Sequence, residues 1–199
     1  MHQPTRERIL DAAHALMRTL GLSRATTKEI ARAAGCSEAA LYKYFASKED
    51  LFVAVLGERL PRLAPLLHRL VLDPGDRSVE ANLTEIARQA VDFYAESFPI
   101  AASLYAETKL KARHDEAMRD LGTGPHMPIE GLDAYLRTEL AAGRIAAGAD
   151  TFAAASLLLG ACAQRAFAYD AQGRTGKQPP QDADDFAAAL ARTLLRGIA

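Results

Sequence analysis

The stretch from residue 26 to residue 51 holds side chains suited to contacting a nucleic acid. At about 100° per residue, Leu41 and Phe45 share one face of a short helix, and Ala39 and Lys43 lie on the opposite face. An exposed face of small residues lets a helix approach the floor of the DNA major groove, where an alanine methyl group can contact a thymine methyl group. Hydroxyl and ammonium groups nearby can bind phosphates. These groups belong to Tyr42, Lys43, Tyr44 and Lys48.

Helix-start signals predict the elements that position these side chains. Thr26 stands three residues before Glu29, the spacing of a capping box. Gly35 can adopt the left-handed conformation that ends a helix, and Ser37 can cap the helix that follows. Ser47, three residues before an aspartate, can cap a third helix. Two short helices joined by a tight glycine-containing turn predict a helix-turn-helix. The alternative is an Ala-rich helical hairpin with no nucleic-acid partner.

The run from Arg8 to Leu51 is dense in motif residues. These are Ile9-Leu10-x-Ala12-Ala13, Gly21, Thr26-Thr27-x-x-Ile30-Ala31-x-x-Ala34-Gly35, Ser37, Leu41-Tyr42-x-Tyr44-Phe45 and Lys48-x-x-Leu51. With these residues the run resembles the N-terminal domain of the tetracycline-repressor (TetR) family of bacterial transcriptional regulators, and the resemblance covers about a quarter of the chain. The remaining three quarters carry no family-wide motif.

The resemblance implies an all-α protein of about nine helices. Residues 1–46 would form a three-helix DNA-binding domain, and residues 47–199 a helical regulatory and dimerisation domain. The implied function is a homodimeric repressor that binds a palindromic double-stranded DNA operator and is released by a small-molecule effector. The alternative is a DNA-bound architectural or protein-recruiting module without an inducer. The expected DNA-binding residues are Thr26, Thr27, Lys28, Ser37, Glu38, Ala39, Ala40, Tyr42, Lys43, Tyr44 and Lys48.

The rest of the chain is also predicted to be helical, because Ala, Leu, Glu and Arg dominate and β-branched alternation is absent. Thr5 is predicted to cap the first helix, which would place Arg6 and Arg8 near the DNA backbone. Pro99 suits the first turn of a helix over residues 100–120.

Composition fits an ordinary globular protein, with 49% apolar and 25% charged residues and a net charge of −1. Residues 1–62 hold ten Lys/Arg against seven Asp/Glu, so the small positive excess lies where DNA contact is expected. The N-terminus has no secretory signal pattern. The apolar run Thr151–Ala163 is too short to span a bilayer. A cytoplasmic protein with no membrane partner is therefore expected.

The last two helices combine leucine with many alanines and glycines, a surface too apolar for solvent and suited to close helix packing. Such helices form either the domain core or a contact with a second copy of the chain. The resemblance implies the second, a four-helix bundle between protomers. The interface residues expected on this basis are Leu157, Leu158, Ala161, Phe186, Leu190 and Leu194.

A small-molecule pocket in the C-terminal helices is likewise implied by the resemblance. Aromatic residues at helical spacing are first of all packing residues, so each candidate has an ordinary core role as its alternative. Arg165 stands in an apolar helix and would need an anionic partner if it were buried. The pocket candidates are Phe93, Tyr94, Phe98, Tyr105, Met118, Tyr135, Gln164, Arg165 and Phe167.

Enzymatic signatures are absent from the sequence. The five histidines show no metal-ligand spacing, and there is no P-loop, dinucleotide fingerprint or nucleophile elbow. The segment His114-Asp115-Glu116 is predicted to be a solvated part of a helix. Cys36 and Cys162 are too few for a disulfide framework and are expected to be small buried hydrophobes. We therefore expect a non-enzyme with neither metal nor cofactor.

Overall fold

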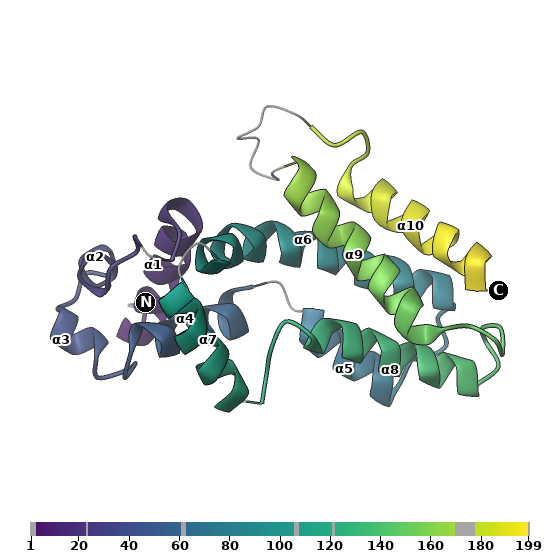
Figure 1. Ribbon diagram of the computed structural model, residues 1–199, viewed down its shortest axis with the longest axis horizontal. Helices are drawn as coiled ribbons and strands as arrows, with labels where there is room; N and C mark the ends of the chain where they lie inside the picture. Colours follow the sequence, from purple (N-terminus) through teal and green to yellow (C-terminus); the bar gives the residue numbers. More distant parts are fainter. Residues whose placement is uncertain are drawn as a thin grey trace. The chain divides into compact units, whose positions relative to one another are not determined.

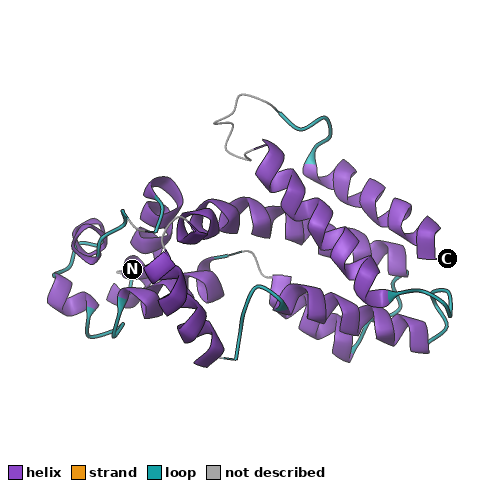
Figure 2. Ribbon diagram, in the orientation of Figure 1, coloured by secondary structure: helices purple, strands orange, loops and turns teal. Residues whose placement is uncertain are grey.

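The computed structural model describes residues 3–22, 24–60, 63–105, 108–120, 122–169 and 178–198. These residues form ten α-helices and no strand, which confirms the all-α prediction (Figures 1 and 2). The helices are α1 Thr5–Leu20, α2 Thr27–Ala33, α3 Glu38–Leu41, α4 Lys48–Arg59, α5 Leu63–Leu72, α6 Val79–Tyr105, α7 Thr108–Asp120, α8 Met127–Ala141, α9 Thr151–Tyr169 and α10 Ala183–Ile198.

The chain divides into two compact units. The N-terminal unit consists of Met1–Leu60 and Glu96–Gly124, and the C-terminal unit of Pro61–Ala95 and Pro125–Ala199. Compactness therefore places α4 and α7 with the first three helices, and α6 contributes residues to both units. The domain limits of 1–46 and 47–199 stay a prediction about function.

The core of the N-terminal unit is built from α1, the two helices after it, α4 and the end of α6. The core side chains on these elements are Ile9, Leu10, Ala13, Met17, Ile30, Ala31, Leu41, Phe45, Leu51, Phe52, Val55, Ile100 and Leu104. One expectation for α1 is wrong, because Pro4 and not Thr5 occupies the N-cap position. Thr5 already lies inside the helix, and its hydroxyl accepts a hydrogen bond from the Arg8 guanidinium at 3.3 Å.

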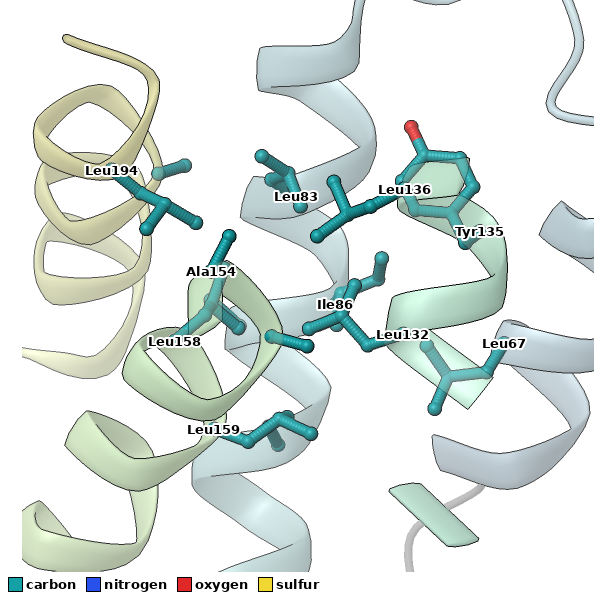
Figure 3. Close-up of a cluster of buried hydrophobic side chains, with 14 of the residues drawn as sticks. Leu67, Leu83, Ile86, Leu132, Tyr135, Leu136, Ala154, Leu158, Leu159 and Leu194 are labelled. Carbon is teal, nitrogen blue, oxygen red and sulfur yellow. The ribbon is translucent and has the colours of Figure 1, made fainter. Parts of the chain in front are cut away.

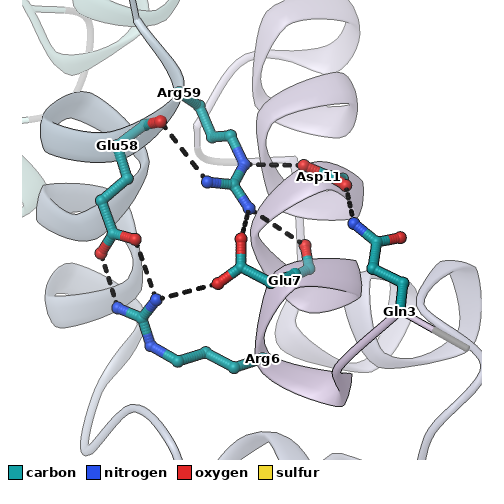
Figure 4. Close-up of polar contacts among 6 residues, drawn as sticks. All are labelled: Gln3, Arg6, Glu7, Asp11, Glu58 and Arg59. Carbon is teal, nitrogen blue, oxygen red and sulfur yellow. Dashed lines mark hydrogen bonds and ion pairs between the residues drawn. The ribbon is translucent and has the colours of Figure 1, made fainter.

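Charged side chains join α1 to α4 (Figure 4). Arg6 donates to both carboxylate oxygens of Glu58, at 2.8 and 2.5 Å. Arg59 reaches back to Glu7 at 2.5 Å and to Asp11 at 2.7 Å. The hydrogen bond from Arg6 is the largest contribution that lowers the pKa of Glu58. The Arg6 guanidinium therefore helps to hold α4 against α1, and its expected position near the DNA backbone stays a prediction.

Helix α7 packs on α4 through a histidine that was predicted to be solvated. His114 is buried, and its ring lies edge-on to Phe52 with 4.8 Å between ring centroids. The expectation failed because the charges of Asp115 and its neighbours suggested solvent, whereas the helical position of residue 114 faces the core. Burial lowers the pKa of His114, so the ring is neutral in its folded environment near pH 7.

The C-terminal unit has its own core, in which α6, α8 and α9 meet and α5 and α10 pack from the sides (Figure 3). Leu83 and Ile86 come from α6, Leu132 and Leu136 from α8, and Leu158 from α9. All five are fully buried. A Cβ atom at residue 131 of α8 would lie 3.3 Å from the Leu67 side chain, so glycine there permits close packing of α5.

Helix α6 runs through the proline that was expected to begin a new helix. Pro99 lies in its interior, and α6 ends at Tyr105. A proline inside a helix removes one backbone hydrogen bond and clashes with the preceding turn. Ile100, the next residue, and Leu104, just over one turn further on, are buried in the N-terminal core. The burial of these two side chains offsets the local cost, which is why the helix continues where local propensity predicts a break.

Helix α9 is longer than the apolar run suggested. In the described part of the chain, it is the one helix whose length and composition would suffice to cross a membrane. It continues past Ala163 to Tyr169, so the apolar run Thr151–Ala163 forms the first part of a longer helix. Its inner side chains, among them Ala154, Leu158 and Cys162, are core residues of the C-terminal unit. A buried core helix meets the same criterion of length and composition.

A buried polar cluster ties the turn after α5 to α6 and α8. Glu139 is completely buried and forms an ion pair with Arg144, which follows the end of α8. Asn82, also completely buried, donates to the carbonyl oxygen of Pro74 at 3.1 Å. Burial, followed by the contact with Glu139, raises the pKa of the nearby Tyr135 hydroxyl well above its usual value. The cluster supplies a counter-ion to Glu139 and a hydrogen bond to the Asn82 amide, groups that are costly to bury alone. Among the described residues, Oε1 of Glu139, Oδ1 of Asn82 and the Tyr135 hydroxyl have no hydrogen-bond partner.

Candidate DNA-binding surface

Helix α2 begins with the capping box that the sequence predicts. The Thr26 hydroxyl accepts a hydrogen bond from the backbone N–H of Glu29 at 3.2 Å. The Glu29 carboxylate accepts from the Thr26 backbone N–H at 3.1 Å. The hydroxyl of Thr26 is the largest contribution that lowers the pKa of Glu29. A helix of seven residues is too short to be stable on its own, so the capping side chains help to fix where α2 begins.

The turn between α2 and α3 is closed by glycine and serine. Gly35 has φ +66°, the left-handed region that favours glycine. The backbone N–H of Cys36 then reaches the Ala31 carbonyl oxygen at 2.9 Å, a bond that closes the end of α2. Ser37 caps α3 by accepting from the Ala40 backbone N–H at 3.1 Å. The predicted helix-turn-helix is therefore present with the predicted caps.

The segment after Ser37, residues 38–44, is the recognition segment. The α-helix proper spans only Glu38–Leu41, but backbone hydrogen bonds to the preceding turn continue as far as Phe45. Leu41 and Phe45 are buried, and Ala39 and Lys43 are exposed, as the spacing predicts. The helix is therefore anchored by one face and presents its small and basic residues on the other.

Two tyrosines widen the exposed face of the recognition segment. Tyr42 and Tyr44 are each 48% exposed, an unusual degree for aromatic side chains in a helix. Lys28 on α2 and Lys43 are exposed and, within the described ranges, have no carboxylate within ion-pair distance. Lys48, at the start of α4, is half-buried. Tyrosine hydroxyls and uncompensated ammonium groups are the kinds of side chain that bind phosphates.

A chain of hydrogen bonds links the beginnings of α2 and α3. The Tyr42 hydroxyl donates to the Thr27 hydroxyl at 3.4 Å. Thr27 in turn donates to Oε1 of Glu38 at 2.5 Å. Sequence reasoning placed all three residues on the DNA side but did not detect this link. No spacing in the sequence signals it, because it depends on how α3 packs across α2.

The residues predicted for a ligand pocket are divided between the two compact units. Tyr105 and Met118 belong to the N-terminal unit and Tyr94 and Tyr135 to the C-terminal unit. Tyr105 is 71% exposed and lies near the Lys111 ammonium group, while Tyr135 is completely buried. The Phe93 and Tyr94 rings contact each other edge-on, with centroids 5.2 Å apart. Burial raises the pKa of Tyr94 to about 12.

The other pocket candidates are spread over different environments. Phe98 and Met118 are half-buried, whereas Gln164 and Phe167 are exposed on α9. Among the described residues, the best-formed hollows are open depressions beside α6, and none of the nine candidates lines them. The pocket assignment stays a prediction.

Arg165 finds partners that are not anionic. Its guanidinium donates to the backbone carbonyl oxygen of Gln181 at 2.7 Å. It also lies over the Phe186 ring, 4.8 Å from the centroid. A carbonyl oxygen and an aromatic face together satisfy a half-buried guanidinium, so this arginine holds the segment before α10 against α9 without a carboxylate.

The predicted interface residues divide into three groups by burial. Leu158 is completely buried and Leu194 is 7% exposed, so both pack in the core of their own chain. They were misplaced because a leucine facing the core and one facing a partner look the same in an Ala-rich helix. Leu157, by contrast, is 65% exposed. The half-buried members are Ala161, Phe186 and Leu190.

The two cysteines and the acidic and histidine side chains define no further site. Burial raises the pKa of the Cys162 thiol to about 12, and its sulfur lies 3.6 Å from the Ala87 carbonyl oxygen. Cys36 is half-buried against the N-terminal core. Within the described ranges, no three His, Cys, Asp or Glu side chains are grouped closely enough to hold a metal ion.

The capped helices, the glycine turn and the exposed recognition segment define a helix-turn-helix domain. Residues 9–55 match the family model for bacterial regulatory proteins of the tetR family. The chain is 39% identical over 67 residues to YvkB, an HTH-type transcriptional regulator of Bacillus subtilis, covering 34% of this chain and 35% of that protein. The match thus spans about a third of this relative's length. The similarity to the TetR family of bacterial regulatory proteins therefore lies in this N-terminal segment.

Solved structures resemble the chain over nearly its whole length. A transcriptional regulator of Mesorhizobium loti assigned to the TetR family superposes with a TM-score of 0.71 at 20% identity, covering 98% of this chain and 96% of that one. FadR of Bacillus subtilis, in complex with stearoyl-CoA, has a TM-score of 0.69 at 18% identity, covering 97% and 99%. At these identities the likeness concerns the fold alone.

Proposed function

We propose that the protein is a DNA-binding transcriptional repressor whose recognition segment, residues 38–44, enters the major groove of an operator. The observation that carries this proposal is the exposure of Ala39, Tyr42, Lys43 and Tyr44 on a helix whose opposite face is anchored in the core. Small residues permit close approach to base edges, and the hydroxyl and ammonium groups fit phosphates. The predicted DNA-binding residues lie on α2 and α3 with their N-cap residues, in the turn after α3, and at the start of α4.

The proposal includes a homodimer on a palindromic operator. A recognition segment of seven residues contacts few base pairs, and a two-fold pair reading half-sites roughly 34–36 Å apart is the usual remedy. Helix α9 presents exposed apolar side chains, with Phe152 53% and Leu157 65% exposed. Gly160 lies on the same exposed face as Leu157 and has open space around it, which suits close approach of another helix.

The proposal also includes release by a small molecule that binds the C-terminal unit. The support is indirect: the similarly folded FadR of Bacillus subtilis was solved with stearoyl-CoA. Effector binding would favour an arrangement of α4 and its partners that binds DNA less well, a coupling free energy between two sites. The alternative is a DNA-bound module that recruits other proteins and has no inducer.

DNA binding is tested with fluorescent duplexes over a range of salt concentrations. Tyr44→Phe and Lys48→Ala should weaken binding to every sequence, and Lys28→Ala should also lower the slope of log K against log salt. The magnitude of that slope falls by about 0.9 for each phosphate that the protein no longer neutralises. Substitutions of Ala39 and Lys43 should instead change which operator is preferred.

Arg137→Ala is the matched control for charge. Arg137 is exposed on α8 in the C-terminal unit, and its side chain is 69% accessible, so the substitution removes one positive charge far from the recognition segment in sequence. It should leave the salt slope unchanged. If it lowered affinity and slope as much as Lys28→Ala does, the assignment of DNA contacts to α2 and α3 would be wrong.

Effector response is tested on the operator complex once an operator is known. A panel of metabolites, including acyl-CoA thioesters, is added and the release of fluorescent operator is measured. Release by one compound at micromolar concentrations, without loss of folded protein, supports the ligand-responsive repressor. A dimer whose operator affinity no compound changes supports the alternative module.

A further inference from the structure

We propose that Glu38 reads a cytosine in the operator, and that Thr27 and Tyr42 set its carboxylate in position. This inference rests on the proposed DNA-binding function and adds the identity of a contacted base. The observation behind it is the hydrogen-bonded chain from the Tyr42 hydroxyl through the Thr27 hydroxyl to Oε1 of Glu38.

The direction of these hydrogen bonds is fixed by the number of protons. The Thr27 hydroxyl has one proton, which it donates to Glu38 because a carboxylate can only accept. Its lone pair is then free to accept from the Tyr42 hydroxyl. Tyr42 therefore donates to Thr27, and Thr27 donates to the carboxylate. Hydrogen bonds in such a chain polarise and strengthen one another. One oxygen of Glu38 is held at 2.5 Å from Thr27, so the side chain is oriented before any duplex arrives.

The second carboxylate oxygen is available to a ligand. Within the described part of the chain, Oε2 of Glu38 has no hydrogen-bond partner. Glu38 is the first residue of α3 and stands beside exposed Ala39, on the side of the domain that also presents Lys43. An anionic group on a surface facing phosphates is repelled unless it accepts a hydrogen bond from a base.

The bases differ in what they offer to a carboxylate in the major groove. Guanine presents two acceptors, and thymine an acceptor and a methyl group. Adenine has an amino donor, but its N7 acceptor lies alongside and repels a second oxygen. Cytosine presents its N4 amino group without a neighbouring acceptor, and Glu and Asp pair with it. A fixed carboxylate at the start of the recognition segment therefore selects a C·G pair in each half-site.

A structural role for Glu38 predicts something different. A carboxylate in the first turn of a helix interacts favourably with the free backbone N–H groups there, and its bond to Thr27 joins α2 to α3. If that were all, removing it would lower stability and weaken binding to all duplexes equally. A change in base preference therefore distinguishes a residue that contacts a base from one that only stabilises the fold.

The experiment measures base preference at every operator position. An operator is first selected from random duplexes by the wild-type chain, and each position is then replaced by the other three base pairs. Wild type should prefer cytosine at one position of each half-site by about 5- to 150-fold, corresponding to the 1–3 kcal/mol of a good base contact. Glu38→Gln should shift the preference at that position to adenine, because an amide pairs with adenine N6 and N7.

Two further variants separate reading from positioning. Thr27→Val keeps the shape of the side chain but removes the hydroxyl, and should reduce the cytosine preference several-fold while the preferred base stays the same. Glu80→Gln removes the same charge from the first turn of α6 and should leave base preference unchanged. Circular dichroism and thermal unfolding confirm that each variant is folded.

The outcomes distinguish this inference from the function on which it rests. Binding with unchanged base preference in folded Glu38→Gln, or a wild-type operator without a required cytosine in either half-site, overturns the role of Glu38 and leaves DNA binding intact. The second of these outcomes needs no variant. Failure of wild type to bind any duplex at low salt overturns the proposed function itself.

Discussion

Replacing Arg144 by methionine would remove the guanidinium that neutralises the buried carboxylate of Glu139. The carboxylate is completely buried, and Arg144 is its ion-pair partner. Arg144 also donates to the Gly75 carbonyl oxygen at 3.4 Å. Methionine keeps most of the apolar volume of the side chain, so the main loss is the counter-ion.

The expected loss of stability depends on which charged group remains without its partner. Leaving one partner of a buried ion pair uncompensated costs about 3–5 kcal/mol. The reverse change, Glu139→Gln, leaves Arg144 with a side chain 35% exposed, which water can solvate, so it should cost only about 1 kcal/mol, the value of one hydrogen bond. The double variant should then be more stable than Arg144→Met alone. At 2–4 °C per kcal/mol for a chain of this size, Arg144→Met should lower Tm by roughly 6–20 °C.

The measurement is urea unfolding of the four proteins at one protomer concentration, which is held fixed because association shifts apparent stability. The coupling energy of the double-mutant cycle is the decisive quantity. The reasoning is contradicted if Arg144→Met and Glu139→Gln lower the free energy of unfolding equally, or if the double variant is no more stable than Arg144→Met. Either result would show that the Glu139 carboxylate does not remain buried and charged when Arg144 is removed.

Three other perturbations have defined outcomes. Thr26→Ala removes the α2 cap and should cost about 1 kcal/mol in thermal unfolding; no loss would mean that α2 needs no capping box. Leu157→Asp places a charge on the exposed face of α9 and should convert a dimer into a folded monomer in sedimentation, whereas Arg137→Ala should not. His114 has a lowered pKa in the folded state, so the unfolded chain binds more protons and stability falls as pH drops from 7 through about 6.5. His114→Leu should flatten that dependence, and an unchanged profile in urea unfolding would contradict the assigned role.

The sequence predicts the helix-turn-helix well because its signals are local. Thr26, Gly35 and Ser37 each act on a backbone group within three to five residues, so their types and spacing suffice. The burial of Leu41 and Phe45 follows from helical periodicity in the same way.

Features that depend on tertiary packing are not predicted from the sequence. Pro99 stays inside α6 because Ile100 and Leu104, which follow it, are buried in the N-terminal core. His114 is buried because its helix packs on α4, although its neighbours in sequence are charged. Leu158 faces its own core while Leu157 is exposed, a distinction that needs the position of α6. In each case the deciding contact comes from a distant segment.

Selection of duplexes from a random pool by the purified wild-type chain tests the central claim most directly. The account predicts enrichment of a palindromic sequence whose two half-sites lie about 10 base pairs apart, centre to centre, with affinity that falls steeply as salt rises. A pool that stays random after repeated rounds at low salt would contradict the claim that residues 38–44 bind DNA as a symmetric pair.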